Sequence, residues 1–236
     1  RLLLELMETS GIPILTNTGY YGARDNQHLP PHAFEESADE LAARWVKEFE
    51  EGIDGTSVRP GFMKIGVNSG ELSDMHQKLI TAAARTHKQT GLTIASHTGP
   101  AVPAFQQLEI LKKEGVQADA FIWVHAQNEQ NWKKHIEAAR RGAWVSLDGV
   151  HQDRIEQYVA MLTNLRKANL LHRTLISHDA GWYSPGEPSG GNFRGFTDLF
   201  DHLLPALAKA GFTKRDVRQL LKRNPRIVFL IQKRLL

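Results

Sequence analysis

Short apolar segments alternate with longer amphipathic segments along this chain. Each apolar segment is followed by a turn and then by apolar residues at helical spacing, which is the pattern of a strand followed by a helix. Strands are therefore predicted at residues 12–17, 62–66, 92–97, 120–125, 143–148 and 173–179.

Helices are predicted between and after these strands. The spacing Ser37-x-x-Glu40 is that of a capping box, and Asn224-Pro225 predicts an N-cap followed by proline at the first helical position. A glycine-, proline- and serine-rich segment at residues 181–195 predicts a mobile loop that is a candidate lid. The predicted helices cover residues 37–52, 73–90, 102–114, 129–141, 152–168, 196–209 and 213–236, and the chain also opens in a helical pattern.

Strict alternation of strand and helix predicts a parallel sheet with right-handed crossovers. Strand ends recur at regular intervals, with 33 residues from position 64 to 97, 28 from 97 to 125, and 54, or two units of 27, from 125 to 179. This regularity favours a barrel over a doubly wound sheet. A TIM (β/α)8 barrel has eight strands in about 250 residues. We therefore expect an α/β barrel that forms one domain over residues 1–236, with about the first two β/α units absent from this sequence.

Composition and charge exclude several kinds of partner. The net charge is only +3, and the densest basic stretch, residues 214–226, is interrupted by leucines and is interpreted as the solvated face of a helix, so no nucleic-acid partner is expected. No apolar run approaches the roughly 18 residues of a membrane helix, so no membrane partner is expected either. The compartment stays open between the cytoplasm, which we favour, and the periplasm. The sequence has no cysteine, so any metal must be bound by histidine, carboxylate or a modified side chain.

Four polar residues end four different predicted strands: Lys64, His97, His125 and Asp179. The carboxyl ends of barrel strands meet at one face, where barrel enzymes build their active sites. Side chains alternate along a strand, so one residue of each neighbouring pair points inward, and His178 beside Asp179 is expected to point outward.

Each of the four also has a purely structural interpretation. A lone histidine at a strand end is often a hydrogen-bonded structural residue, and Asp179 could cap the following loop. Lys64 is harder to explain in this way, because burying an ammonium in an apolar strand costs free energy unless the group is paired or modified. The occurrence of all four at regular spacing favours a shared site. The remaining candidates on helices or loops are interpreted as structural: His135, His151, His172 and His202.

Six segments together resemble the motifs of one protein family. They are residues 61–66 (Gly-Phe-Met-Lys-Ile-Gly), 94–98 (Ile-Ala-Ser-His-Thr), 124–125 (Val-His), 176–179 (Ile-Ser-His-Asp), 18–21 (Thr-Gly-Tyr-Tyr) and 224–229 (Asn-Pro-Arg-Ile-Val-Phe). The chain resembles, over essentially its whole length, the phosphotriesterase family of the amidohydrolase superfamily.

The resemblance implies a binuclear metal centre. Lys64 would be N6-carboxylated and bridge two divalent metal ions, and His97 and His125 would bind one of them. Asp179 would bind the other and accept a proton from the bridging hydroxide, so Lys64 and Asp179 are the expected catalytic residues. Zinc is the expected metal, with manganese, cobalt or iron as alternatives. A carbamate would turn the lysine into an anionic ligand, and two metal ions would acidify a bridging water and polarise the substrate oxygen.

One motif of that family does not occur in the sequence. A His-x-His pair on the family's first strand completes the second metal site, and His28 and His32 lie four residues apart in a proline-broken segment, which makes them poor substitutes. We expect the pair to lie in the absent units, and the intact protein to be binuclear.

The expected substrate is a small molecule with a hydrolysable ester bond. A lactone or carboxylic ester is favoured, a sugar lactone being the narrower version, and a phosphotriester or organophosphate is the alternative. A non-catalytic barrel with an incomplete metal site is the alternative from another class. Family members are often dimers, so a homodimer is considered. The residues expected to contact the substrate are Tyr21, Arg24 and Trp182, and Gln127 and Asn128 are further candidates for the mouth of the pocket.

Overall fold

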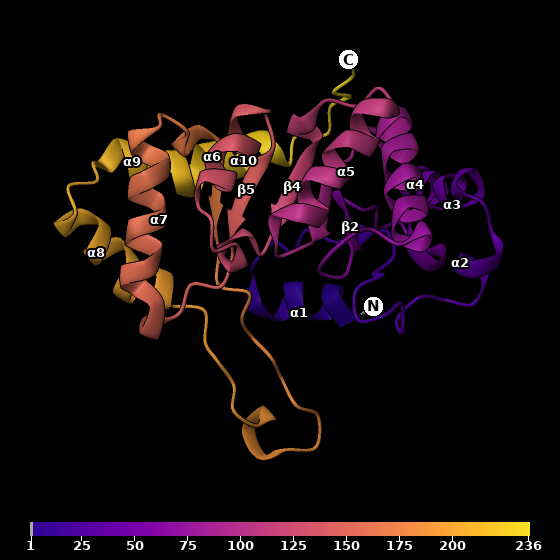
Figure 1. Cartoon of the computed structure of the whole chain (residues 1–236). Coiled ribbons are helices and arrows are strands. Elements are labelled where there is room, and N and C mark those ends of the chain that lie inside the picture. Colours follow the sequence, from indigo (N-terminus) through magenta and orange to yellow (C-terminus); the bar gives the residue numbers. More distant parts are fainter. Residues whose placement is uncertain (1) are drawn as a thin grey trace. The chain divides into compact units, whose positions relative to one another are not determined.

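The computed structural model describes residues 2–236 (Figure 1). Its six strands are hydrogen-bonded in sequence order, and the pairings of β1 with β2, β2 with β3 and β5 with β6 are parallel. The strands are β1 Asn17–Thr18, β2 Phe62–Gly66, β3 Ile94–His97, β4 Phe121–Val124, β5 Trp144–Leu147 and β6 Thr174–Ile176. The predicted parallel arrangement is therefore confirmed.

Helices follow the strands, as the alternating pattern predicted. They are α1 Leu2–Ser10, α2 His32–Glu35, α3 Ala38–Glu51, α4 Asp74–Thr90, α5 Ala101–Lys113, α6 Lys133–Arg140, α7 Ile155–Lys167, α8 Leu204–Lys209, α9 Lys214–Arg218 and α10 Asn224–Val228. Two π-helical segments, Leu199–Leu203 and Gln219–Arg223, precede α8 and α10. Within residues 2–236, no helix combines the length and the apolar character needed to cross a membrane.

The contacts within the chain define two compact units. The first unit contains residues up to 98, 102–122 and 228–236, and the second contains residues 99–101 and 123–227. The expectation of one domain over residues 1–236 stays a prediction, and each unit is described separately.

In the first unit, α3 packs against α4, and α4 lies against β2 and β3. The predicted capping box opens α3, because the Ser37 side chain accepts from the Glu40 backbone and the Glu40 carboxylate accepts from the Ser37 backbone. The core between these elements is apolar. Its fully buried side chains include Trp45, Met63 and Ile65.

The C-terminal segment of the first unit corrects the predicted last helix. Helical structure ends at Val228, although the pattern predicted a helix to residue 236. The Arg234 guanidinium is only 7% exposed and donates to the Thr93 hydroxyl at 3.1 Å and to the Leu230 carbonyl at 3.1 Å. The backbone N–H of Arg234 donates to Nε2 of His87 at 2.9 Å. These contacts satisfy polar groups that a helix would have paired internally, so the segment stays extended.

In the second unit, α6 packs on β5, and α7 contacts α8 and the π segment before it. Asn224 corrects the predicted N-cap. It is fully buried inside a continuous helical stretch, with φ −61° and ψ −52°. Its side-chain amide donates to the carbonyls of Leu171 at 2.7 Å and Thr174 at 2.6 Å, so it ties the helix to the start of β6.

Every predicted strand except 62–66 is shorter than expected, and the first and the last lose the most residues. Of residues 12–18, Asn17 and Thr18 pair with β2, whereas residues 12–15 are exposed and contain Pro13, which has no N–H to donate. Strand β6 ends at Ile176, because Asp179 adopts a left-handed backbone with φ 45°. Asp179 therefore lies in the loop beyond the strand.

Candidate metal centre

In the first unit, Lys64 and His97 share one face of the β2–β3 pair. Lys64 is opposite Ala95, and Gly66 is opposite His97. Paired residues on neighbouring strands point to the same face, and residues two apart along a strand do so as well. Lys64 and His97 are therefore on the same face and one pleat apart. Both are half-buried, so Lys64 is less enclosed than the apolar sequence around it suggested.

Tyr21 lies against this face. Its ring centroid is 5.1 Å from that of His97, in an edge-to-face arrangement. Tyr21 forms a parallel bridge with Gly66, and a Cβ at Gly66 would lie 2.9 Å from Cδ2 of the Tyr21 ring. The absence of a side chain at Gly66 thus makes room for Tyr21 beside His97. The structure brings together three of the predicted site residues in this unit: Lys64, His97 and Tyr21.

The other candidates of the first unit lie in the segment after Tyr21. Arg24 is exposed, and it begins a left-handed run in which its φ is 57°. His28 is exposed, with its ring centroid 5.9 Å from that of Tyr21. His32 opens α2, and its Nε2 hydrogen-bonds with the Tyr20 hydroxyl at 2.8 Å. A substrate contact from Arg24 stays a prediction.

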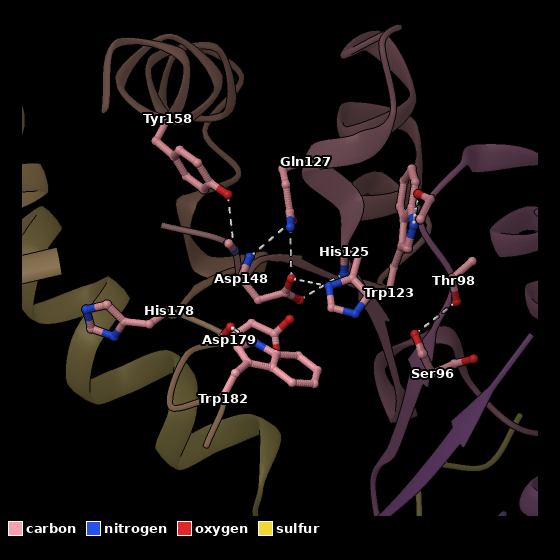
Figure 2. Close-up of polar contacts among 12 residues, drawn as sticks. Ser96, Thr98, Trp123, His125, Gln127, Asp148, Tyr158, His178, Asp179 and Trp182 are labelled. Carbon is pink, nitrogen blue, oxygen red and sulfur yellow. Dashed lines mark hydrogen bonds and ion pairs between the residues drawn. The ribbon is translucent and has the colours of Figure 1, made fainter. Parts of the chain in front are cut away.

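In the second unit, His125 follows β4 directly and Asp148 follows β5 directly (Figure 2). The Nδ1 of His125 is 2.6 Å from Oδ1 of Asp148, and the backbone N–H of His125 donates to Oδ2 at 2.8 Å. Gln127 donates from Nε2 to Oδ1 of Asp148 at 3.0 Å and accepts the Asp148 backbone N–H at 3.1 Å. Asp148 therefore links the ends of two strands.

The electrostatics of this cluster favour an ionised Asp148. Burial would raise the pKa of the Asp148 carboxyl, but the hydrogen bonds from His125 and Gln127 outweigh burial, and the pKa lies below its ordinary value. The pKa of the neighbouring Tyr158 is shifted in the opposite direction. Burial, together with the Asp148 charge, raises the pKa of the Tyr158 phenol, which accepts the Gly149 N–H at 3.1 Å. The phenol therefore remains protonated.

Asp179 and Trp182 lie in the long loop after β6, which is drawn in orange in Figure 1. The indole N–H of Trp182 donates to the Asp179 carbonyl at 3.1 Å, and the Arg194 guanidinium donates to the same carbonyl at 2.6 Å. Both Asp179 and Trp182 are exposed. Figure 2 shows the Asp179 side chain directed toward the His125–Asp148 pair and His178 directed away. His178 accepts the Leu199 backbone N–H at 2.9 Å through Nε2, as an outward-pointing residue would.

The predicted ligands are thus divided between the units, with Lys64 and His97 in the first and His125 and Asp179 in the second. Across residues 2–236, no three side chains of His, Asp or Glu are gathered closely enough to hold a metal ion. The full ligand set, which also uses a carbamate on Lys64, stays a prediction.

Sequence reasoning did not identify Asp148 as a site residue. The signal was present, because Asp148 ends a predicted strand just as His125 does. The structural interpretation of His135 agrees with its surroundings. His135 is 1% exposed, hydrogen-bonds with the Ala126 carbonyl at 2.7 Å, and packs edge-on to Trp123.

Known proteins resemble this chain over most of its length. The Phosphotriesterase family model matches residues 1–229. The phosphotriesterase homology protein of Escherichia coli is 32% identical over 229 residues, which cover 95% of this chain and 77% of that protein. An aryldialkylphosphatase of Saccharolobus solfataricus is 26% identical over 240 residues, 97% of this chain and 76% of that protein.

Solved structures give the same answer about the fold. The crystal structure of the E. coli phosphotriesterase homology protein, with phosphate in its active site, superimposes with a TM-score of 0.86 at 30% identity, covering 96% of this chain and 78% of that one. A lactonase of Listeria monocytogenes has a TM-score of 0.86 at 23% identity, covering 98% of this chain and 77% of that one. These similarities confirm the TIM-barrel class, of which this chain has six strands. The chain belongs to the phosphotriesterase family, whose members include hydrolases.

Proposed function

We propose that this protein is a metal-dependent hydrolase of lactones or carboxylic esters. The observation that supports it most is that a half-buried lysine, Lys64, lies on the same face of two parallel strands as His97. Lys64 is two residues before the end of β2, and His97 is the last residue of β3. Once carboxylated, Lys64 would offer an anionic oxygen ligand on the same face as the His97 imidazole.

The chemistry of the donor set fits divalent metal ions. His97 and His125 offer imidazole nitrogens, and Lys64, once carboxylated, and Asp179 offer oxygens, which together suit zinc. The Nδ1 of His125 is engaged by Asp148, so Nε2 would be the atom that binds the metal. When bound, a pair of metal ions would acidify a water molecule and polarise the substrate carbonyl.

The residues of the chain would perform the remaining tasks. A carboxylate oxygen of Asp179 would accept the proton from the attacking water and later pass it to the leaving alcohol. Tyr21, beside His97, would contact the substrate from the first unit, and Trp182 would do so from the loop after β6. Arg24 would meet an anionic group of the substrate, such as that of a sugar acid lactone.

A phosphotriester is the second candidate substrate. It is favoured by the similarity to the aryldialkylphosphatase of S. solfataricus. Lactone and phosphotriester hydrolysis both require a water to attack an electrophilic centre while charge develops on an oxygen, so one metal centre could serve either reaction. Substrate preference would then depend on the residues around the pocket.

The test is metal analysis of the full-length protein combined with assays on lactones, aryl esters and a phosphotriester. We expect bound divalent metal and hydrolysis of a lactone or ester. The variant Lys64→Ala should lose bound metal and at least about 1,000-fold in kcat/KM, which corresponds to about 4 kcal/mol of transition-state stabilisation. Short carboxylic acids added to the assay should partly restore both.

The matched control is Lys88→Ala, which removes an exposed lysine from α4 in the same unit. It should leave metal content and kcat/KM unchanged. A full-length protein that binds no divalent metal and hydrolyses none of the three substrate classes would establish the non-catalytic alternative instead. Hydrolysis of the phosphotriester alone would decide for the second candidate.

A further inference from the structure

His125 has a backbone conformation that few residues with a side chain adopt. Its φ is 62° and its ψ is 32°, in the left-handed region, directly where β4 ends. A residue other than glycine is uncommon there and needs support from its surroundings. The support comes from Asp148, whose Oδ2 accepts the backbone N–H of His125 at 2.8 Å.

The same carboxylate also determines which ring nitrogen of His125 carries the proton. Its Oδ1 lies 2.6 Å from Nδ1. Both carboxylate oxygens already accept, Oδ1 from Nε2 of Gln127 at 3.0 Å and Oδ2 from the His125 backbone N–H, so we assign Nδ1 as the donor. In the neutral ring the lone pair is then on Nε2, and a histidine that donates from one nitrogen to a carboxylate is the usual form of a metal-bound histidine. One buried side chain thus fixes both the backbone and the tautomer of His125.

Asp148 is itself held in place from two sides. Gln127 contacts it twice, from Nε2 to Oδ1 at 3.0 Å and from the Asp148 N–H to Oε1 at 3.1 Å, so the amide has one orientation. The next residue, Gly149, donates its N–H to the Tyr158 hydroxyl at 3.1 Å. A Cβ on Gly149 would be 2.9 Å from both Nε2 of Gln127 and the Tyr158 oxygen, so these groups close tightly over it.

We propose that Asp148, oriented by Gln127, is a positioning residue that presents Nε2 of His125 as a metal ligand. Asp148 does not touch the metal or the substrate in this account. It acts through His125, by setting the tautomer of the ring and the direction in which the ring leaves the strand. The inference rests on the proposed function, since it assumes that His125 is a ligand.

The alternative interpretation is a buried ion pair that only stabilises the fold. Asp148 is 4% exposed, so removing it would disturb folding in either case. Stability alone therefore cannot distinguish the two interpretations. The affinity for zinc can distinguish them. The contact of Asp148 with Nδ1 sets the tautomer of His125 in both interpretations, whereas a purely structural ion pair has no reason to change zinc binding.

The test compares the full-length wild type with Asp148→Asn, which keeps the shape of the side chain but removes its charge. Zinc affinity is measured by competition with a chromophoric chelator, and the His125 tautomer by nitrogen NMR of the imidazole in the metal-free protein. We expect the wild type to have a protonated Nδ1 and an Nε2 signal that moves on zinc addition. The Asp148→Asn variant should bind zinc about 10–100-fold more weakly and show a mixture of tautomers.

Gln127→Ala is the second variant, for the case that Asp148→Asn does not fold. It leaves His125 and the carboxylate in place and removes only the contacts that orient the carboxylate, so a smaller loss of affinity, severalfold, is expected. Glu129→Gln is the matched control. Glu129 is a half-buried carboxylate of the same unit that accepts backbone N–H groups of Ala101 and Asn131, and it should leave zinc affinity within twofold.

The outcomes separate this inference from the proposed function. If the wild type binds zinc and Asp148→Asn, or Gln127→Ala where the former does not fold, shows the same zinc affinity, the positioning role is wrong while the hydrolase proposal stands, whatever tautomer the variant has. If the wild-type His125 signal does not respond to zinc at all, His125 is not a ligand, and both the ligand set and the positioning role fail. If His125 responds and only the Asp148 and Gln127 variants weaken binding, the role is established.

Discussion

The two units position their predicted metal ligands in different ways. In the first unit, Lys64 and His97 are on regular strands, and the register of β2 and β3 alone puts them on one face. In the second unit, His125, Asp148 and Asp179 all lie just beyond the strands, and hydrogen bonds determine their geometry. Strand register is set by the hydrophobic pattern of the whole strand and by its turns, so no single polar side chain determines it, whereas a hydrogen-bonded cluster depends on each of its members. The geometry around the predicted ligands of the second unit should therefore be the more sensitive to substitution.

The largest expected difference in stability is between alanine substitutions of two glycines, one in each unit. Gly149→Ala would push a methyl group against Gln127 and Tyr158, at 2.9 Å from each polar atom. Because these groups are fixed by hydrogen bonds, we expect a loss of about 2–3 kcal/mol in the free energy of unfolding and weaker zinc binding. The measurement is denaturant unfolding with chelator competition.

The partner variant is Gly66→Ala, which would push a methyl group against the Tyr21 ring at 2.9 Å. Tyr21 is half-buried and can move outward, so a smaller loss of about 1 kcal/mol is expected, together with a raised KM if Tyr21 contacts the substrate. Equal losses of unfolding free energy in the two variants would contradict the expected difference in sensitivity between the two units.

Local features of this chain were predictable from the sequence because their causes are local. The capping box at Ser37 and the bounds of β2 follow from residues that are neighbours in the sequence. The last helix was wrong because its outcome depends on distant partners. Arg234 contacts Thr93, and Asn224 contacts Leu171, at separations of 141 and 53 residues. No local pattern contains that information.

The sequence could only nominate residues for the candidate site. Position near strand ends nominated Lys64, His97 and His125, because a barrel gathers its strand ends at one face, and their role as ligands stays a prediction. The role of Asp148 follows from a contact with His125 over 23 residues, between two neighbouring strand ends. The strand-end position of Asp148 was a signal that the sequence analysis did not use, and the left-handed backbone of His125 that Asp148 supports could not be foreseen from the residue types.

The next prediction concerns one buried histidine in each unit. Burial is the main cause that lowers the pKa of His87 and of His135. The unfolded state, with a histidine pKa near 6.5, then binds more protons than the folded state as the pH falls. Stability is therefore complete above about pH 6.5 and decreases below it, with a slope of up to about 1.4 kcal/mol per pH unit for each group.

The two histidines should differ in what protonation disrupts. In His87 both nitrogens are engaged, Nδ1 with the Leu92 carbonyl and Nε2 with the Arg234 N–H, so a second proton would directly oppose that N–H. The charges around His87 are Arg234, which lowers its pKa, and Asp119, which raises it, while Glu129 raises that of His135. His87→Gln and His135→Gln should each flatten the pH dependence of the unfolding free energy between pH 6.5 and 5. An unchanged slope in both variants would assign the acid sensitivity to other groups.

The smallest expected effect comes from removing a helix cap, and it should be the same in the two units. Each has a helix that begins with a capping box, Ser37 with Glu40 at α3 and Thr213 with Asp216 at α9. Replacing either cap by alanine removes an acceptor for an N-terminal N–H group and should cost about 1 kcal/mol of the free energy of unfolding. Both boxes are determined by neighbours in the sequence and neither contacts a candidate ligand, so zinc affinity should be unchanged in both variants. Thermal unfolding of Ser37→Ala and Thr213→Ala, with zinc titration, measures this. If one cap variant weakened zinc binding as Gly149→Ala is expected to do, the sensitivity of the second unit would reflect its general stability and not the hydrogen bonds around His125.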